Sequence, residues 1–296
     1  MKDVEDLYYK NFTKDNIVYS LDMLRLKTYI DYNDWNDFIF WLETYFSKKI
    51  KHNWIGKSLR EFHYNYSVEL EEGKSFYIGF QHNNEKVTDF ENKYNFTIEF
   101  NPNKLRDDNI LLSILNRWGN WFIKSYDIAF DIPINILDLI YDMSGRGVEK
   151  IDNRGYDKKT IYIGTGDGRV KIYNKKEESN LAITGNMTRV EISRQIEDFP
   201  INRIKYFSYD KTFPNVYTNN YIYSLKDYED KTMLAILYAV QNGFPLRNLT
   251  KTYRSKIKNL LEGGYKIKFD YKLVEQVIKQ TMYAYFVRRE SKQVIF

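Results

Sequence analysis

Short segments in which apolar and polar residues alternate one by one recur through the first two thirds of the chain, and they constrain the fold most. Successive side chains of a β-strand point to opposite faces, so a period of two indicates strands with one buried face. The pattern predicts strands over residues 62–70, 75–80, 95–100, 125–132, 160–164, 169–173 and 188–193. Helical spacing lies between some of them, over residues 34–50, 108–122 and 133–143. The first part of the chain is therefore predicted to be an α+β domain with an antiparallel sheet.

The polar sides of these strands carry an unusual number of acidic residues. Asp127, Asp131, Glu99 and Glu191 stand on strands that are otherwise rich in Ile, Val and Phe. Strands are depleted in Asp, and acids gathered on one face repel each other unless a cation lies among them. The alternative is an ordinary antiparallel sheet whose second face is simply wet.

The two strands that flank the sequence TGDG are predicted to pair as a hairpin. Their apolar residues then face each other on one side, Ile163 opposite Val170 and Ile161 opposite Ile172. Tyr173, opposite Thr160, falls on the polar side of the hairpin. Lys171 and Lys175 lie two residues before and after Tyr173, so they share its face if the strand continues.

A metal site built from the four acids would have to draw on more than one strand. Asp127 and Asp131 lie roughly 13 Å apart along an extended strand at about 3.3 Å per residue, so one ion cannot bind both. A site would use one of them together with Glu191 or Glu99 from a neighbouring strand. Oxygen ligands of this kind suit Mg²⁺ or Mn²⁺.

Other residue types exclude several kinds of site. Cysteine is absent, which excludes disulfides, thiolate metal sites and a cysteine nucleophile. The histidines, His52, His63 and His82, never form a pair such as H-x-H. No run of about 18 apolar residues exists and the N-terminus lacks the apolar core of a secretory signal. We expect a soluble, cytoplasmic protein that does not contact a membrane.

The formal net charge of +5 is distributed unevenly. Residues 201–296 hold 17 Lys and Arg against 8 Asp and Glu, whereas residues 1–200 hold 28 against 32. Helical spacing prevails in the second part, over 230–243, 248–264 and 270–290. The chain is therefore predicted to divide into an α+β part, 1–200, and a basic, mainly helical part, 201–296, that binds a polyanion such as DNA.

Three basic residues of the second predicted helix in this part, Lys251, Arg254 and Lys258, follow helical spacing at i, i+3 and i+7. We predict that they contact phosphates of duplex DNA. A solvated helix face is the alternative.

Three segments, in this order and spacing, resemble the Rep_trans or replication initiation factor family. They are SYDIAFDIP at 125–133, TIYIGTGDGRVKIYNKKEE at 160–178 and TRVEIS at 188–193. The family comprises initiators of certain rolling-circle plasmids, together with related relaxases of conjugative elements and some phage proteins. The resemblance covers residues about 90–200. Tyr126 departs from it, because the family often has Arg before the first acid.

The resemblance implies a nicking-endonuclease domain that is HUH-like but has carboxylates in place of the histidine pair. It places Tyr173 at the family's nucleophile and Asp127, Asp131 and Glu191 at its acids. It implies metal-assisted transesterification on one DNA strand of an origin, with Mg²⁺ or Mn²⁺. The products would be a 5′-phosphotyrosyl protein and a free 3′-hydroxyl primer.

Neighbouring side chains are expected to support this chemistry. Only about 0.1% of a phenol with a pKa near 10 is ionised at neutral pH. Lys171 and Lys175 would favour the phenolate and neutralise phosphate charge. Arg189 on the polar side of its strand is a predicted DNA contact. Besides DNA, a host helicase and a second copy of the chain are candidate partners. The alternatives are a conjugative or mobilisation relaxase with the same chemistry and a non-catalytic DNA-binding regulator.

Overall fold

The computed structural model describes residues 13–46, 50–52, 61–71, 74–82, 93–105, 108–142, 149–153, 159–175, 186–210, 213–218, 230–241, 244, 246–262 and 266–286. The chain forms two compact units that interleave in sequence. Unit 1 comprises Met1–Tyr19, Ala129–Ser193 and Tyr209–Val274, and unit 2 comprises Ser20–Ile128, Arg194–Ser208 and Glu275–Phe296. Both units contain residues from each side of position 200. The roles assigned to the parts 1–200 and 201–296 stay a prediction.

Unit 2 is built on an antiparallel sheet with helices packed against it. The hydrogen-bonded strand order is β3 (Ile50–His52), β4 (Phe62–Glu71), β5 (Lys74–His82), β6 (Tyr94–Phe100), β2 (Ile17–Ile30) and β7 (Phe122–Ile132). Its helices are α2 (Tyr32–Phe46), α3 (Asn109–Arg117) and the 3₁₀ turn η2 (Ile201–Tyr206). The strands predicted from residue alternation over 62–70, 75–80, 95–100 and 125–132 are all present.

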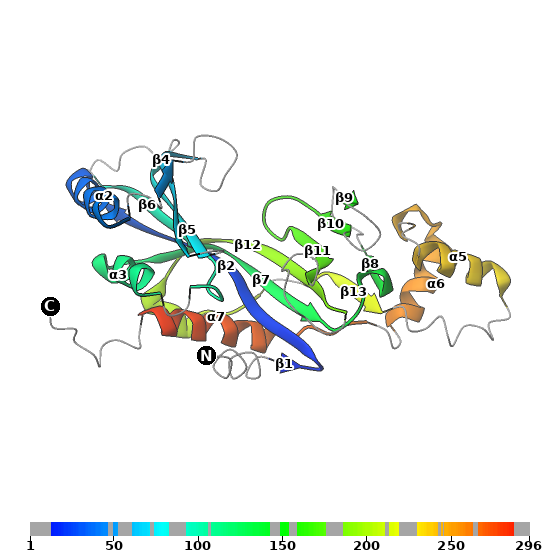
Figure 1. The fold of residues 1–296 in the computed structure, drawn as a ribbon. Helices are drawn as coiled ribbons and strands as arrows, with labels where there is room; N and C mark the ends of the chain where they lie inside the picture. Colours follow the sequence, from blue (N-terminus) through cyan, green and yellow to red (C-terminus); the bar gives the residue numbers. More distant parts are fainter. Residues whose placement is uncertain are drawn as a thin grey trace. The chain divides into compact units, whose positions relative to one another are not determined.

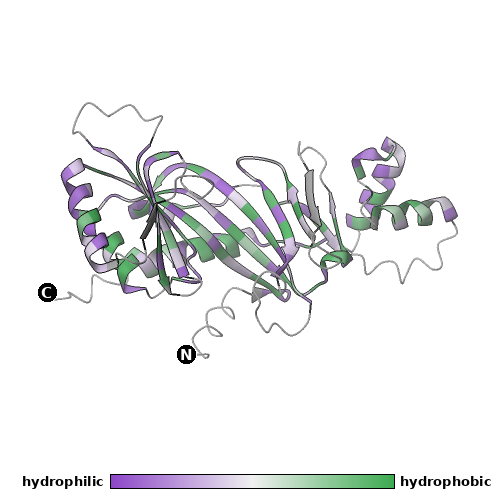
Figure 2. Cartoon of the chain, turned by 45° about the horizontal axis from the view of Figure 1, so that its top comes forward, coloured by the Kyte–Doolittle hydropathy of each residue, from purple (hydrophilic) through white to green (hydrophobic). Residues whose placement is uncertain are grey.

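An aromatic core holds α2 against one face of this sheet. Trp35 stacks on Phe80 with ring centroids 4.5 Å apart. Phe38 meets Phe96 and Trp118 edge-on, with ring centroids 5.5 and 5.2 Å apart. Hydrophobic and hydrophilic residues alternate along the strands in Figure 2, as expected for strands with one apolar face. Burying aromatic side chains of this size is the main source of stability for such a layer.

Strand β2 was not among the predicted strands, although it is the longest of the sheet. Its buried residues change phase between Leu21 and Leu24. Leu24 and Leu26 alternate on the core face opposite Phe100 and Ile98 of β6. Because the buried positions shift by one residue within the strand, the alternation of apolar and polar residues is not continuous, and the strand was not recognised from the sequence.

Unit 1 contains a second stretch of antiparallel sheet and the helices of the C-terminal part. Its strand order is β7, β12 (Thr188–Pro200), β11 (Val170–Asn174), β10 (Lys159–Ile163) and β9 (Glu149–Asn153), with β1 (Thr13–Lys14) beside β2. A separate pair joins β8 (Leu139–Asp142) to β13 (Asn215–Thr218). The helices are η1 (Ile136–Asp138), α5 (Lys231–Gln241), η5 (Leu246–Asn248), α6 (Lys251–Glu262) and the start of α7 (Tyr271–Phe286). Strands β2, β7 and β12 and helix α7 each divide between the units.

The β10–β11 hairpin has the register that residue alternation predicted. Its pairs are Thr160 with Tyr173, Ile161 with Ile172, Tyr162 with Lys171 and Ile163 with Val170. Gly164, Gly166 and Gly168 in the connecting turn all have positive φ, between 66° and 76°. This backbone conformation favours glycine, which explains the glycine-rich turn without any role in phosphate binding.

The predicted helix over 133–143 was wrong. Asn135 caps a single 3₁₀ turn, η1, by accepting a hydrogen bond from the backbone N–H of Leu137. The chain then enters β8, in which Ile140 pairs with Tyr217 of β13. Pairing with a strand some 75 residues later in the sequence overrides the local helical spacing. Residue 143 lies outside the described residues.

The other predicted helices exist with different ends. The helix predicted over 34–50 is α2 and ends at Phe46, and the one predicted over 108–122 is α3 and ends at Arg117. The three predicted for the C-terminal part are α5, α6 and α7, and their predicted glycine ends at 242–243 and 263–264 lie outside the described residues. The α+β class, with an antiparallel sheet and C-terminal helices, is confirmed.

Helices α5 and α6 pack together beside β8 and β13 in Figure 1. A cluster of buried apolar side chains joins these elements: Ile140, Tyr217, Met233, Leu237, Val240, Leu246, Ile257 and Leu261. This cluster fixes which face of α6 points to solvent. None of the helices in the described part of the chain is both long and apolar enough to cross a membrane.

Candidate active site

The polar face of the β10–β11–β12 sheet in unit 1 brings several predicted site residues together. Tyr173 of β11 lies directly opposite Arg189 of β12, and Lys171 lies opposite Glu191. Residues two apart on a strand share a face, so these four side chains project on the same side. The apolar residues Val170, Ile172, Val190 and Ile192 are fully buried on the other side.

Tyr173 and Glu191 form a direct hydrogen bond, in which the phenol donates to Oε1 of the carboxylate. Both side chains are buried, with 3% of Tyr173 and 7% of Glu191 exposed. A hydrogen bond to a buried carboxylate is charge-assisted and therefore stronger than one between neutral groups. The phenol is thus held by a group that can also accept its proton.

Two lysines place positive charge against the same phenol. The Lys171 ammonium lies 3.3 Å from Oε2 of Glu191 and 4.0 Å from the centre of the Tyr173 ring. The Lys175 ammonium lies 5.9 Å from that ring centre. A cation over a ring face is attracted to the ring, and the attraction increases where water is excluded. The structure thus places both lysines beside Tyr173, as expected from their spacing on the strand.

Asp131 and Arg189 form a buried ion pair in the same unit. Arg189 donates from Nε to Oδ1 at 2.6 Å and from Nη2 to Oδ2 at 2.7 Å. The planar guanidinium matches a carboxylate in this two-point geometry. The pair connects β7 to β12 on the polar face and leaves Arg189 nearly inaccessible to solvent. A DNA contact from Arg189 stays a prediction.

The remaining predicted acids belong to unit 2. Glu99 accepts hydrogen bonds from Nε and Nη2 of Arg25 at 2.8 and 2.6 Å, and Glu61 accepts one from Nη1 at 2.8 Å. Asp127 is half-buried on β7. The structure therefore places Asp131 and Glu191 with Tyr173 in one unit, and Asp127 and Glu99 in the other.

The described carboxylates do not form a metal site as they stand. No group of three or more His, Asp or Glu side chains able to hold a metal ion occurs among the described residues. In unit 1, Asp131 is bound by Arg189 and Glu191 by Lys171. Mg²⁺ prefers six oxygen ligands, and both carboxylates are already paired with a cationic side chain here. The use of Mg²⁺ or Mn²⁺ remains a prediction from the resemblance.

The predicted DNA-binding residues of α6 occupy different environments. Lys251 is exposed, whereas Lys258 is half-buried. Arg254 donates from Nη2 to the backbone carbonyls of Arg247 and Leu249, at 2.9 Å for Leu249. Arg254 therefore fixes the turn before α6, and its contact with phosphates stays a prediction.

Of the exposed face of α6, only Lys251 was among the residues predicted from the sequence. This face carries Lys251, Thr252, Ser255, Lys256 and Asn259. The buried positions Ile257 and Leu261 were the available signal, because they define the opposite side of the helix. A face of this composition offers two ammonium groups and several hydrogen-bonding side chains to a ligand.

Comparison with known proteins finds similarity over part of the chain. No family model matches the chain. A "Replication initiation protein" of Staphylococcus aureus is 40% identical over an alignment of 91 residues, and the match covers 28% of this chain and 29% of that protein. The matched part thus spans less than a third of the relative. Over that segment, the resemblance to replication initiation proteins is confirmed.

A solved structure described as a rolling circle replication initiator protein from Geobacillus stearothermophilus was also found. It is 12% identical, with a TM-score of 0.35, and the match covers 83% of this chain and 97% of that one.

Proposed function

We propose that this protein is a rolling-circle replication initiator that nicks one strand of its origin DNA, with Tyr173 as the nucleophile. The partial identity to a replication initiation protein supports the biological role. One observation carries the chemistry, namely the hydrogen bond that the Tyr173 phenol donates to the buried carboxylate of Glu191. Nucleophilic catalysis by a hydroxyl needs such a base within hydrogen-bond reach.

Glu191 acts as the general base in this proposal. A phenol is almost entirely protonated at neutral pH, so attack on phosphorus needs a group that removes the proton as the bond forms. Glu191 already accepts the hydrogen bond along which that proton would move. Lys171 contacts both the carboxylate and the ring, and its charge favours the phenolate in the transition state.

The reaction exchanges one phosphodiester for another. The Tyr173 oxygen attacks the scissile phosphorus, the bond from phosphorus to the 3′ oxygen breaks, and Glu191 takes the phenolic proton. The leaving 3′ oxygen acquires a proton and becomes a 3′-hydroxyl that a polymerase can extend. The 5′-phosphate stays on Tyr173, so the strand can later be rejoined without ATP. Lys171 and Lys175 neutralise the charge that develops on the phosphate oxygens.

The exposed face of α6 is the proposed contact with origin duplex. Its two lysines, Lys251 and Lys256, would bind phosphates, while Thr252, Ser255 and Asn259 offer hydrogen bonds to phosphates or base edges. Lys258 is half-buried and Arg254 binds the backbone carbonyls of Arg247 and Leu249, so we expect both to add less to DNA affinity than the two exposed lysines. A helicase and a second copy of the chain remain predicted partners.

A nicking assay tests the proposal. Supercoiled DNA carrying the replicon that encodes this protein is incubated with wild type, with Tyr173→Phe and with Tyr162→Phe, each with Mg²⁺, with Mn²⁺ and with EDTA. Tyr162 is a matched control, since it pairs with Lys171 in the same hairpin. Wild type and Tyr162→Phe are expected to nick, and Tyr173→Phe is not.

Other outcomes separate the alternatives. Nicking by Tyr173→Phe would show that another residue is the nucleophile. Origin binding without nicking by any of the proteins would favour the non-catalytic regulator. Nicking at a transfer origin, rather than at the replication origin, would favour a relaxase. Loss of nicking in EDTA would confirm the predicted metal requirement.

A further inference from the structure

One face of the unit 2 sheet is both polar and buried, which is unusual for a sheet surface. The opposite face holds the aromatic core, so ordinary antiparallel packing would leave this face wet. Six of its side chains on β2, β4 and β6 are instead at most 8% exposed, whereas Arg25, Tyr29 and Glu69 on the same face reach solvent. The six are Lys27, Asn65, Ser67, Asn95, Thr97 and Glu99. Burying polar groups costs free energy unless they are hydrogen-bonded, so apolar residues would stabilise the fold more simply. Several of these groups are hydrogen-bonded within the unit, Glu99 to Arg25 and Thr97 to Asn95, which allows the face to stay polar.

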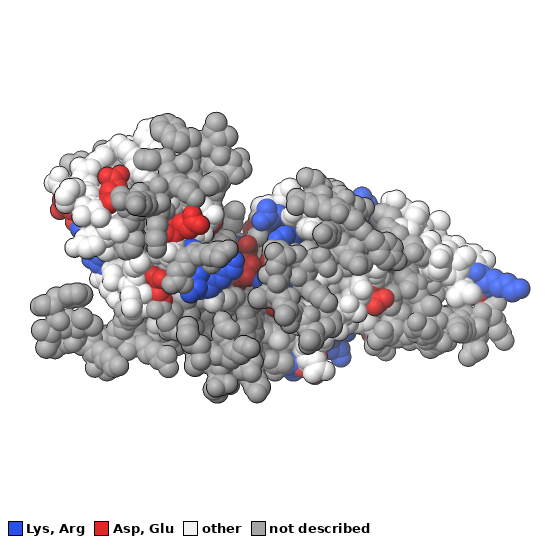
Figure 3. Space-filling model, viewed as in Figure 1, with Lys and Arg blue, Asp and Glu red and all other residues white. Residues whose placement is uncertain are grey.

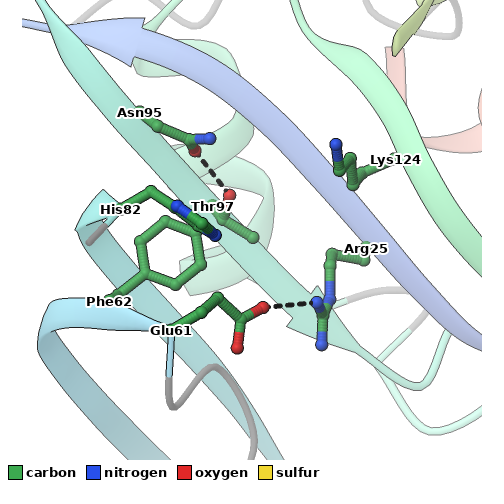
Figure 4. A pocket seen from close by; sticks show the side chains of 7 residues that line it. All are labelled: Arg25, Glu61, Phe62, His82, Asn95, Thr97 and Lys124. Atoms are coloured by element: carbon green, nitrogen blue, oxygen red, sulfur yellow. Dashed lines mark hydrogen bonds and ion pairs between the residues drawn. The ribbon is translucent and has the colours of Figure 1, made fainter. Parts of the chain in front are cut away.

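A cavity opens at this face in unit 2. Its volume is about 150 Å³, which is room for about five water molecules at about 30 Å³ each. Figure 4 shows the side chains that line it, from β2, β4, β5, β6 and β7 and the residue before β4. The size suits one small flat group, and the lining combines aromatic, polar and charged side chains.

Phe62 forms an aromatic wall of the cavity, and Gly79 makes this possible. A Cβ at position 79 would lie 2.6 Å from Cγ of Phe62, so only glycine lets the ring rest against the strand. His82 meets the same ring edge-on, with centroids 5.1 Å apart and an angle of 89°. The ring is therefore held in one orientation from two sides.

Asn95 and Thr97 form the polar end of the cavity. The Thr97 hydroxyl donates to Oδ1 of Asn95 at 2.7 Å, as drawn in Figure 4. Both side chains are buried, so this bond fixes the orientation of the carboxamide. A carboxamide has both donor and acceptor atoms and can bind the edge of a heterocycle.

The charged groups at the cavity are already balanced. Arg25 uses three of its N–H donors on Glu99 and Glu61. Lys124 is half exposed at the rim and lies 3.7 Å from Asp198. Arg25, the cation inside the cavity, is matched by two carboxylates at 2.6–2.8 Å and is therefore poorly suited to bind a phosphate. Lys124 at the edge has the longer contact, with Asp198, and is half exposed, so it is the better placed of the two.

We propose that this cavity binds a single unstacked base of single-stranded DNA. The base would lie against Phe62, its edge would meet Asn95, and Lys124 would contact the adjoining phosphate. Base-aromatic stacking combined with a backbone cation is the usual physical basis of single-strand binding. The choice of DNA as ligand rests on the proposed function, while the preference for a base over a phosphate rests on the cavity.

Binding of single strands that differ only in their bases tests the proposal. The probes are fluorescein-labelled homopolymers of dA, dC, dG and dT of about 16 nucleotides and an abasic strand of the same length. Fluorescence anisotropy gives the ratio of affinities for each homopolymer over the abasic strand. The proteins carry Tyr173→Phe, so that no strand is cleaved.

Phe62→Leu and Asn95→Leu are expected to lower this ratio about fivefold or more for at least one base, because stacking is worth about 1–3 kcal/mol per base. Affinity for the abasic strand should stay as in the parent protein. Phe40→Leu, which changes an exposed ring of α2 in the same unit, is the matched control and should leave the ratio unchanged.

An unchanged ratio in both pocket variants, each shown by circular dichroism to be folded, would overturn the proposal. If Phe62→Leu fails to fold, Asn95→Leu decides alone. The result is independent of the proposed catalysis: a protein that nicks but shows unchanged ratios refutes only the base pocket. A protein that does not nick but shows the expected ratios refutes only the proposed function.

Discussion

At the scale of single residues, Glu191 is central to the proposed chemistry, because its carboxylate contacts both Tyr173 and Lys171. If Glu191 removes the phenolic proton, Glu191→Gln should keep a hydrogen bond to Tyr173 but slow nicking by about 10²–10⁴-fold. Glu197→Gln is the matched control, because it makes the same change at an exposed position of the same strand, β12. Initial nicking rates on supercoiled DNA measure the effect, and equal rates for the two variants would refute the role of Glu191 as base.

The Asp131–Arg189 pair predicts a large effect on stability. Asp131→Asn leaves the buried guanidinium without a full countercharge, so the free energy of unfolding should fall by about 3–5 kcal/mol. Lys279→Ala removes a helical i, i+4 pair with Glu275 and should cost only about 0.3–0.5 kcal/mol. Urea unfolding compares the two, and a loss below about 1 kcal/mol for Asp131→Asn would show that the pair is not structurally important.

The sequence identified the residues around Tyr173 as candidates, but it did not show which of them contact one another. Tyr173, Lys171 and Lys175 were assigned to one face because two-residue spacing on a strand fixes it. The bond between Tyr173 and Glu191 could not be foreseen without the pairing of β11 with β12. That register also shows that Lys171, and not Tyr173, is the direct neighbour of Glu191 across the strands.

At the scale of elements, Asp270 links the start of α7 to strand β1. Its carboxylate accepts hydrogen bonds from the backbone N–H groups of Lys272 and Leu273, and Lys14 donates to it at 2.6 Å. The bond from Lys14 and these backbone bonds lower the pKa of Asp270 below its usual value of 3.8, against the opposite effect of burial. This helix start thus prefers a charged carboxylate.

A pH-dependent stability follows for Asp270. A carboxyl group with a lowered pKa in the folded state adds stability above its ordinary pKa and loses it as the pH falls through the folded-state pKa. Wild type should exceed Asp270→Asn by about 0.3–1 kcal/mol at neutral pH, and the difference should vanish well below pH 3.8. Urea unfolding at both pH values measures it. A difference that is the same at both would mean that the charge of Asp270 does not matter.

Strands and helices could be predicted from the sequence where the local residue pattern agreed with the strand pairing in the folded protein. The β10–β11 hairpin was found with its register because alternation and a glycine turn point to the same structure. Strand β2 was missed since its alternation shifts phase, and the segment 133–143 was wrong because Ile140 pairs with distant Tyr217. The cavity beside Phe62 was also missed, because it depends on a bare Gly79 in the strand that pairs with β4.

At the scale of the whole molecule, the described Lys and Arg residues visible in Figure 3 are not gathered into one continuous stripe. On the face drawn in Figure 3, Lys and Arg side chains form small groups, and Asp and Glu side chains lie next to several of them. The net charge of the C-terminal part indicated a polyanion partner, but the buried positions of α6 were needed to select the lysines that face solvent. The proposed DNA contacts are therefore defined by the solvent-exposed side of α6, and not by the net charge of the C-terminal part.

The face of α6 gives a prediction for duplex binding. Replacing Lys251 and Lys256 together by Ala should weaken binding of all duplex sequences and reduce the salt slope by about 2, or about 1 for each phosphate contact. Lys104→Ala, which removes an exposed lysine of unit 2, should leave the slope unchanged. Titrations at several salt concentrations provide the slopes, and identical slopes for wild type and the double variant would exclude α6 from phosphate binding.

The most direct test of the central claim is the identity of the residue that becomes attached to DNA. Wild-type protein is incubated with the supercoiled replicon, digested with nuclease and trypsin, and analysed by mass spectrometry. The account predicts a 5′-phosphonucleotide on the peptide that contains Tyr173, and no such adduct in Tyr173→Phe. An adduct on any other residue, or nicked DNA without a covalent protein, would contradict it.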